Sequence, residues 1–172
     1  MFVLFIANIV FTKNNIFIQE KGKTMISIKI KNNKKFMGEL FAGNNFDIFN
    51  ISNCVIKTFS VITISGNRNY KWHEEDKSSF DEYCSWKEVK ETVYNIIKGT
   101  KTPDLLNIVF LEECVENENN VGVMNLKYEN DEINIVVGYN YATFSMDKSN
   151  EKEWEKKVIS LLEKNSIDFE IC

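Results

Sequence analysis

Residues 121–140 read VGVMNLKYENDEINIVVGYN. Apolar residues alternate with other residues on both sides of a polar turn at 129–132, first at Met124, Leu126 and Tyr128 and then at Ile133, Ile135 and Val137. This period of two with a short turn predicts an antiparallel hairpin. We expect the chain after Gly138 to add a third strand, which gives a meander over 121–146. The linkers are too short for parallel crossovers.

Helical spacing is clearest directly upstream. Ser85-x-x-Glu88 is a capping-box pattern, and Gly99 and Pro103 are typical of a helix end. Between them one apolar stripe runs through Trp86, Val89, Val93, Ile96 and Ile97. A helix is therefore predicted over 86–98. Weaker stripes with their own caps predict helices over 33–41 and 151–164, the second ending in a left-handed Asn165.

Further strands are predicted over 26–30, over 46–65 in two or three runs, and over 105–112, which we expect to be buried on both faces. Tyr70 and Trp72 suggest a short return strand, and Ile167 to Ile171 an edge strand. Together the patterns predict an α+β domain, with a mostly antiparallel sheet and three main helices packed on it.

Composition limits the possible classes of protein. The chain has 172 residues and a net charge of −4, with 25 acidic and 21 basic residues. A strongly basic protein that coats nucleic acid is excluded by this balance. Hydrophobic residues make up 44% of the chain, which suffices for a packed core and excludes wholesale disorder. We expect a single domain over 25–172.

Residues 1–24 differ from the remainder. The apolar run 2–12 is shorter than the roughly 20 residues of a membrane helix, and no basic residue precedes it as in a signal peptide. Codons for Lys21–Gly22 are purine-rich, like a ribosome-binding site, and lie just before Met25. We therefore expect Met25 to be the native start, and residues 1–24 to be an untranslated leader or a disordered extension. A signal or anchor segment and a genuine N-terminal strand are the alternatives.

Cysteine and histidine give little support for catalysis. Cys54, Cys84, Cys114 and Cys172 lack the C-x₂₋₄-C spacing of metal sites and favour a reducing cytoplasm. Cys84 precedes a helix and could be a nucleophile, although a small buried side chain is the favoured interpretation. The single histidine, His73, begins the polar stretch His73–Asp76, which we interpret as a solvated loop rather than a cation site. No catalytic residue, metal ligand or cofactor site is predicted.

Four residues are candidate contacts. Lys98 and Lys101 follow the 86–98 helix, where lysines favour the helix dipole and could alternatively meet an acidic partner. The dipole role is the favoured one, and the glycine spacing of a phosphate loop is absent. Asp147 and Lys148 precede the last helix, and we favour a turn there over a contact site. Residues 67–72 are the only stretch that resembles single-strand nucleic-acid binding.

Several short motifs resemble an uncharacterised bacterial family, the domain of unknown function numbered 5721, over about residues 25–170. They include Tyr83-x-x-Trp86-x-Glu88–Val89, Lys98–Gly99-x-Lys101–Thr102–Pro103, Leu126-x-Tyr128–Glu129–Asn130 and Thr143–Phe144-x-Met146–Asp147–Lys148–Ser149 with Trp154. The resemblance brings no established activity, so it transfers no catalytic residue.

The expected function is a non-catalytic binding or interaction module in the cytoplasm. Its partner is a protein or a small ligand of unknown identity, nucleic acid is not excluded, no membrane is expected, and the oligomeric state is open. Two alternatives remain. One is a DNA-clamp-like protein, because a strand–helix–strands order occurs twice. The other is a cysteine-dependent enzyme that uses Cys84.

Overall fold

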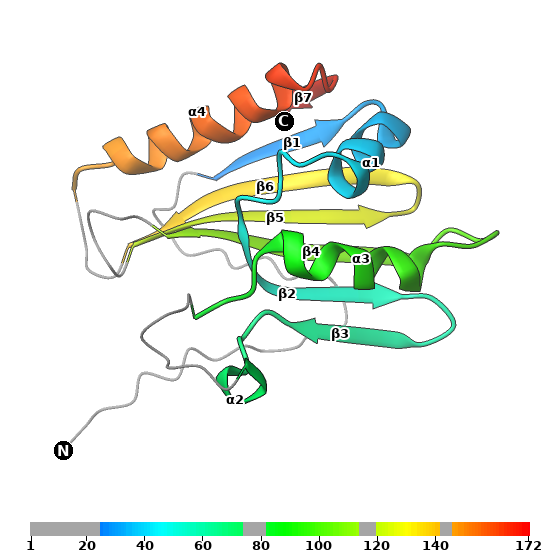
Figure 1. Cartoon of the computed structure of the whole chain (residues 1–172). Coiled ribbons are helices and arrows are strands. Elements are labelled where there is room, and N and C mark those ends of the chain that lie inside the picture. The colour runs from blue at the N-terminus through cyan, green and yellow to red at the C-terminus, as the bar shows by residue number, and fades with distance from the viewer. Residues whose placement is uncertain (1–24, 74–81, 114–119, 142–145) are drawn as a thin grey trace.

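The computed structural model describes residues 25–73, 82–113, 120–141 and 146–172. Within these ranges seven strands form one sheet in the order β3-β2-β4-β5-β6-β1-β7, and every pairing is antiparallel (Figure 1). The strands are β1 (Ile26–Ile30), β2 (Asn50–Lys57), β3 (Val61–Ser65), β4 (Leu105–Glu113), β5 (Val121–Glu129), β6 (Glu132–Asn140) and β7 (Phe169–Ile171). The predicted α+β class is confirmed.

The β5–β6 hairpin lies near the middle of the sheet. Leu126 of β5 is paired with Ile108 of β4 on one side and with Ile135 of β6 on the other, and all three side chains are buried. Asn130 and Asp131 have φ of 54° and 60°. A two-residue turn with positive φ at both central positions matches the twist of the strands that it joins.

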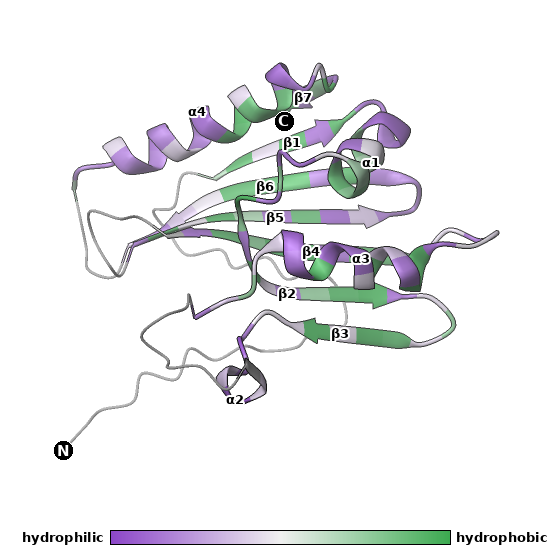
Figure 2. Cartoon of the chain, viewed as in Figure 1, coloured by the Kyte–Doolittle hydropathy of each residue, from purple (hydrophilic) through white to green (hydrophobic). Residues whose placement is uncertain are grey.

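Three helices pack on one face of the sheet (Figure 1). They are α1 (Asn33–Ala42), α3 (Trp86–Ile97) and α4 (Ser149–Lys164), and a four-residue helix, α2 (Tyr70–His73), follows β3. Hydrophobic stretches run along the strands and recur at intervals on the helices (Figure 2). The rings of Phe110, Trp86 and Phe49 meet at centroid distances of 5.5–6.1 Å in the core between the two layers.

The capping box of α3 is present. The backbone N–H and the hydroxyl of Ser85 both donate to the Glu88 carboxylate, at 2.7 and 2.8 Å. Arg68, the only arginine of the chain, donates two 2.8 Å hydrogen bonds to the same carboxylate and is 7% exposed. These bonds lower the pKa of Glu88 to about 2 and tie the turn after β3 to the start of α3.

Some predicted strand features are wrong. Tyr70 and Trp72 belong to α2, and Trp72 is 81% exposed. The strand β4 is buried on one face only, because Leu106, Ile108 and Phe110 point to the helices while the alternate side chains are half-buried on the opposite face. Tyr139 and Asn140 end β6 and begin no new strand, and residues 142–145 of the predicted third strand lie outside the described residues.

Helix boundaries also differ at the last helix. It begins at Ser149, two residues before the predicted 151, because Asp147 accepts a 2.9 Å hydrogen bond from the Ser149 backbone N–H. At its end the left-handed residue is Ser166, with φ 51°, whereas Asn165 has φ −88°. None of the helices among the described residues combines the length and apolar character that crossing a bilayer requires.

Candidate functional site

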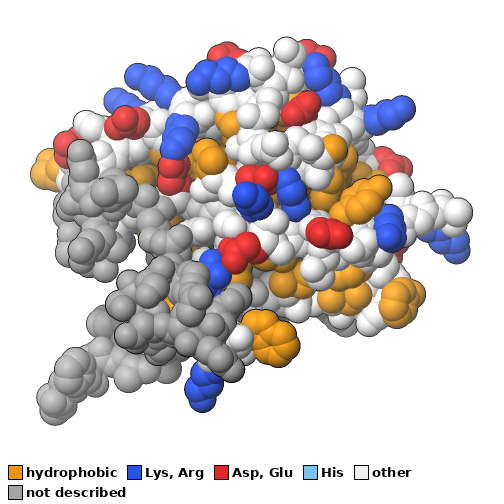
Figure 3. Space-filling view, viewed as in Figure 1, with side chains coloured by type: hydrophobic (Ala, Val, Ile, Leu, Met, Phe, Trp, Pro, Cys, Tyr) orange, Lys and Arg blue, Asp and Glu red, His pale blue; other side chains and the backbone are white. Residues whose placement is uncertain are grey.

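A groove of about 840 Å³ lies at the end of the sheet where the β5–β6 turn meets two helices. One wall is α1 and the other is the C-terminal turn of α3 with the loop 98–103 that follows it. Tyr128 and Asp131 of the β5–β6 hairpin close the groove at the sheet. Hydrophobic side chains reach the surface between α1 and α3, with basic side chains beside them (Figure 3).

The floor of the groove is apolar. Its main side chains are Met37 and Phe41 of α1 and Tyr94 and Ile97 of α3. The rings of Phe41 and Tyr94 are 5.7 Å apart. Tyr94 is 49% exposed, so the floor is open to solvent. The four side chains therefore offer an apolar surface to a ligand.

Gly38 lies in the wall formed by α1, at a position where the fold does not require glycine. A Cβ built at this residue meets no heavy atom within 4 Å. Glycine inside a helix costs roughly 0.5–1 kcal/mol relative to alanine. The missing side chain leaves room in the groove that a helix-favouring residue would occupy.

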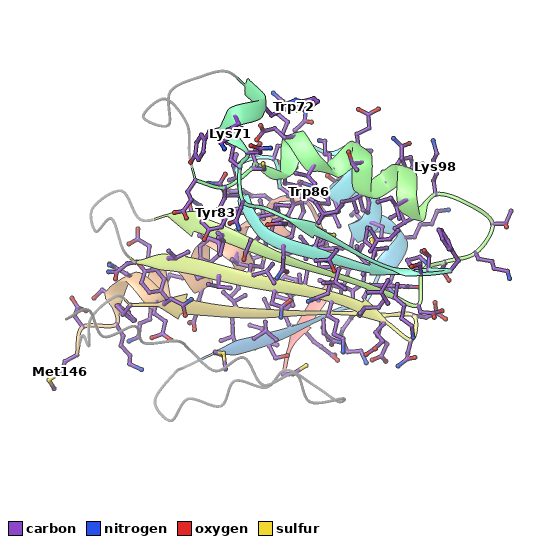
Figure 4. The ribbon with its side chains drawn as sticks, turned by 90° about the horizontal axis from the view of Figure 1, so that it is seen from below. Lys71, Trp72, Tyr83, Trp86, Lys98 and Met146 are labelled. Carbon is purple, nitrogen blue, oxygen red and sulfur yellow. The ribbon has the colours of Figure 1, made fainter. Side chains whose placement is uncertain are left out.

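Buried contacts hold the two helices that form the walls. The indole N–H of Trp86 donates a 2.9 Å hydrogen bond to the carbonyl of Leu40, and Phe41 packs against the same indole with ring centroids 5.6 Å apart. Lys90 donates to both carboxylate oxygens of Asp47, at 2.7 and 2.8 Å, and the two side chains are 18% and 12% exposed. Figure 4 shows Trp86 between α3 and the sheet, and Lys98 at the other end of the same helix.

Polar contacts fix the wall next to the sheet. The Tyr128 hydroxyl donates a 2.8 Å hydrogen bond to Asp131 and also bonds with Thr102 of the loop. Asn33, at the start of α1, donates to the carbonyl of Asp131. The loop, the turn and α1 are thus linked around Asp131. Burial is the main cause that raises the pKa of Tyr128.

Three lysines line the groove. Lys34 comes from the first turn of α1, Lys98 follows the last residue of α3, and Lys101 lies in the loop. All three are exposed, and none forms a salt bridge with another residue of the described ranges. Lys98 and Lys101, both predicted contacts, are therefore brought together at one site with Lys34, which the sequence did not single out.

Asp147 and Lys148, the other two predicted contacts, lie elsewhere. Asp147 accepts hydrogen bonds from the Ser149 backbone N–H and hydroxyl, and these bonds lower its pKa. Lys148 is 3.8 Å from Glu151, whose side chain is 4% exposed. Both residues support the start of α4, as expected for the turn that the sequence favours.

The thiols differ in their surroundings. Burial raises the pKa of Cys54 to about 12, and burial also raises the pKa of Cys84 although Arg68 opposes it. A raised pKa keeps a thiol protonated at neutral pH, which does not favour a nucleophile. Among the residues described, no three His, Cys, Asp or Glu side chains are grouped as metal ligands. The described ranges exclude Cys114 and residues 74–76 of the His73–Asp76 stretch. They also exclude residues 114–118 of the segment 112–118, which contains four glutamates.

A family model described as "Family of unknown function (DUF5721)" matches residues 39–170, which is most of the chain. The chain belongs to this family. The matched range of the DUF5721 chain includes α3, the loop 98–103 and the β5–β6 turn, while Lys34 and Gly38 lie just before it. No curated protein and no solved structure matches the chain.

Sequence reasoning missed one wall of this groove in the DUF5721 chain. The helix predicted over 33–41 rests on one apolar stripe, formed by Phe36, Met37, Leu40 and Phe41. Phe36 and Leu40 are buried, whereas Met37 and Phe41 are half-buried in the groove. Two features of the sequence could have indicated this wall. The apolar stripe of α1 is wider than packing on the core alone requires, and the first turn of the helix carries lysines but no acidic residue.

Proposed function

We propose that this protein is a non-catalytic binding module, and that the groove between α1, α3, the loop 98–103 and the β5–β6 turn is its binding site. The observation that carries the proposal is the apolar floor with three lysines at its edge that form no salt bridge with any residue the structure describes. Ligand sites are concave and mostly apolar, with a few polar groups that fix orientation. The volume of the groove, about 840 Å³, lies in the range of such sites.

The cytoplasm remains the proposed compartment. Cys54, Cys84 and Cys172 are all free thiols, although Cys172 is exposed. Unpaired cysteines are usual in compartments that keep thiols reduced. The free thiols therefore support an intracellular partner.

A neutral solvatochromic dye, Nile red, tests the groove without relying on charge. The dye is expected to bind the wild-type protein with an increase in fluorescence. Gly38→Trp places a large side chain in the open space at Gly38 and is expected to abolish dye binding while circular dichroism stays unchanged. Gly38→Ala is the matched control, because it keeps the helix and most of the space. If the dye binds all three proteins equally, the groove is not the binding site.

A further inference from the structure

We propose that the partner is a protein segment in which large apolar side chains are flanked by Asp or Glu, with the apolar side chains on the floor and the carboxylates at Lys34, Lys98 and Lys101. This inference rests on the proposed function and specifies its ligand. The carrying observation is charge complementarity. Three lysines from two chain segments, α1 and the loop 98–103, border one apolar groove in a protein of net charge −4.

Lys34 is the most informative of the three. It lies in the first turn of α1, which contains no acidic residue, and a cation is disfavoured at this end of a helix dipole. Its neighbour Lys35 is accounted for by a 2.6 Å hydrogen bond to the carbonyl of Ser166. Lys34 makes no salt bridge with a described residue. Dipole compensation can explain Lys98 and Lys101 but not Lys34, so an anion in the groove explains all three.

A protein segment fits the groove better than a small molecule. Small-molecule sites usually bury most of the ligand surface. Here the floor includes the half-exposed Tyr94, and two helices border the groove along its sides. Such a shape is typical of a groove that receives an amphipathic segment through a few apolar anchors.

A nucleic acid fits the same groove poorly. The only arginine, Arg68, is held by Glu88 away from the groove, and the exposed Trp72 lies on α2, with no part in its lining. Polyphosphate recognition relies on many basic contacts and tolerates salt poorly. Three lysines around an apolar floor instead match a short acidic segment with apolar anchors.

Two fluorescein-labelled peptides test the inference. The first carries Leu and Phe flanked by glutamates, and the second has every Glu replaced by Gln. Fluorescence anisotropy with the full chain is expected to detect the acidic peptide only, with affinity falling as salt screens the charges. The triple variant Lys34→Gln/Lys98→Gln/Lys101→Gln is expected to bind the acidic peptide about tenfold more weakly. Lys87→Gln, an exposed lysine of α3 outside the groove, is expected to bind like wild type.

The outcomes separate this inference from the proposed function. Equal binding of both peptides, or unchanged affinity in the triple variant, overturns the inference of an acidic partner. The groove stands as the binding site in that case if it still binds Nile red. Lysine-dependent binding of a mixed-sequence single-stranded oligonucleotide, without binding of the acidic peptide, overturns that inference in favour of nucleic acid. If neither Nile red nor any peptide binds, the proposed function fails together with this inference.

Discussion

The Tyr128 hydroxyl lies 2.8 Å from the Asp131 carboxylate and donates a hydrogen bond to it across the β5–β6 turn. Tyr128 is 7% exposed, while Asp131 has a left-handed backbone and accepts a second bond from Asn33 at its carbonyl. The turn that ends the central hairpin is thereby joined to α1 and to the loop 98–103. This junction shapes the groove at the end of the sheet where β5 turns into β6.

Removing that hydroxyl is expected to destabilise the protein. Tyr128→Phe leaves Asp131 without its hydroxyl donor, so we expect a loss of about 1–2 kcal/mol in the free energy of unfolding. Urea denaturation followed by fluorescence measures this loss. Tyr94→Phe is the control, because that ring lies half-exposed in the groove. Equal stability of Tyr128→Phe and wild type would show that the junction contributes nothing.

The same tyrosine gives a prediction at alkaline pH. The folded-state pKa of Tyr128 is raised above its ordinary value, so the contribution to stability is present below the ordinary pKa of about 10 and is lost as pH rises through the folded pKa. Burial also raises the pKa of Tyr141, so a spectrophotometric titration of tyrosinate should show late ionisation of both tyrosines, and the step due to Tyr128 should be missing in Tyr128→Phe. Its absence from the wild-type curve contradicts the assigned burial.

Acid is expected to weaken the hydrogen bonds and the ion pair that Glu88 makes at the start of α3. The pKa of Glu88 is lowered to about 2, so its contribution is present above its ordinary pKa of about 4.5 and is lost as pH falls toward 2. Glu88→Gln is expected to cost about 1 kcal/mol at neutral pH and to flatten the acid dependence of the melting temperature. Glu91→Gln, on the exposed side of the same helix, should behave like wild type. Parallel acid profiles for Glu88→Gln and wild type would exclude the ion pair with Arg68 as a source of stability.

Two glycines should respond in opposite ways to alanine. A Cβ at Gly122 would lie 2.7 Å from the Trp154 ring, so Gly122→Ala is expected to destabilise by about 1–3 kcal/mol through overpacking. A Cβ at Gly38 meets nothing within 4 Å, so Gly38→Ala is expected to stabilise by about 0.5–1 kcal/mol. Thermal unfolding of both variants measures the two effects, and a stabilising Gly122→Ala would contradict the contact with α4.

Thiol reactivity tests the alternative of a cysteine-dependent enzyme. Because burial raises the pKa of Cys84, its alkylation at neutral pH should be slower than that of the exposed Cys172 and should accelerate as pH rises. Mass spectrometry of peptides after brief treatment with iodoacetamide resolves the two sites. Fast labelling of Cys84 that is independent of pH would instead support a nucleophile.

Local periodicity predicted the sheet and the helices because their signals lie within a few residues of each other. The alternation in β5 and β6 and the capped stripe of α3 are such signals. A four-residue segment is too short for its spacing to distinguish a strand from a helix. The spacing of Tyr70 and Trp72 therefore predicted a strand where α2 forms. The prediction that β4 is buried on both faces is wrong, because an apolar run does not reveal how many layers cover a sheet.

The groove depends on contacts between distant parts of the chain. Asn33 and Asp131 are 98 residues apart, and Trp86 and Leu40 are 46 apart. Spacing within one helix indicates neither contact. Lys98 and Lys101 could be selected from the sequence because they follow a recognisable helix end, whereas the importance of Lys34 becomes visible only once α1 lies opposite them.

A heteronuclear NMR titration of the labelled protein with the acidic peptide locates the binding surface directly. We expect the perturbed backbone amides to cluster around the groove, at Gly38, Tyr94, Gly99 and Thr102. Binding in the groove is contradicted if these signals do not move and the shifts occur instead at the exposed tip of the β2–β3 hairpin, around Phe59 and Val61.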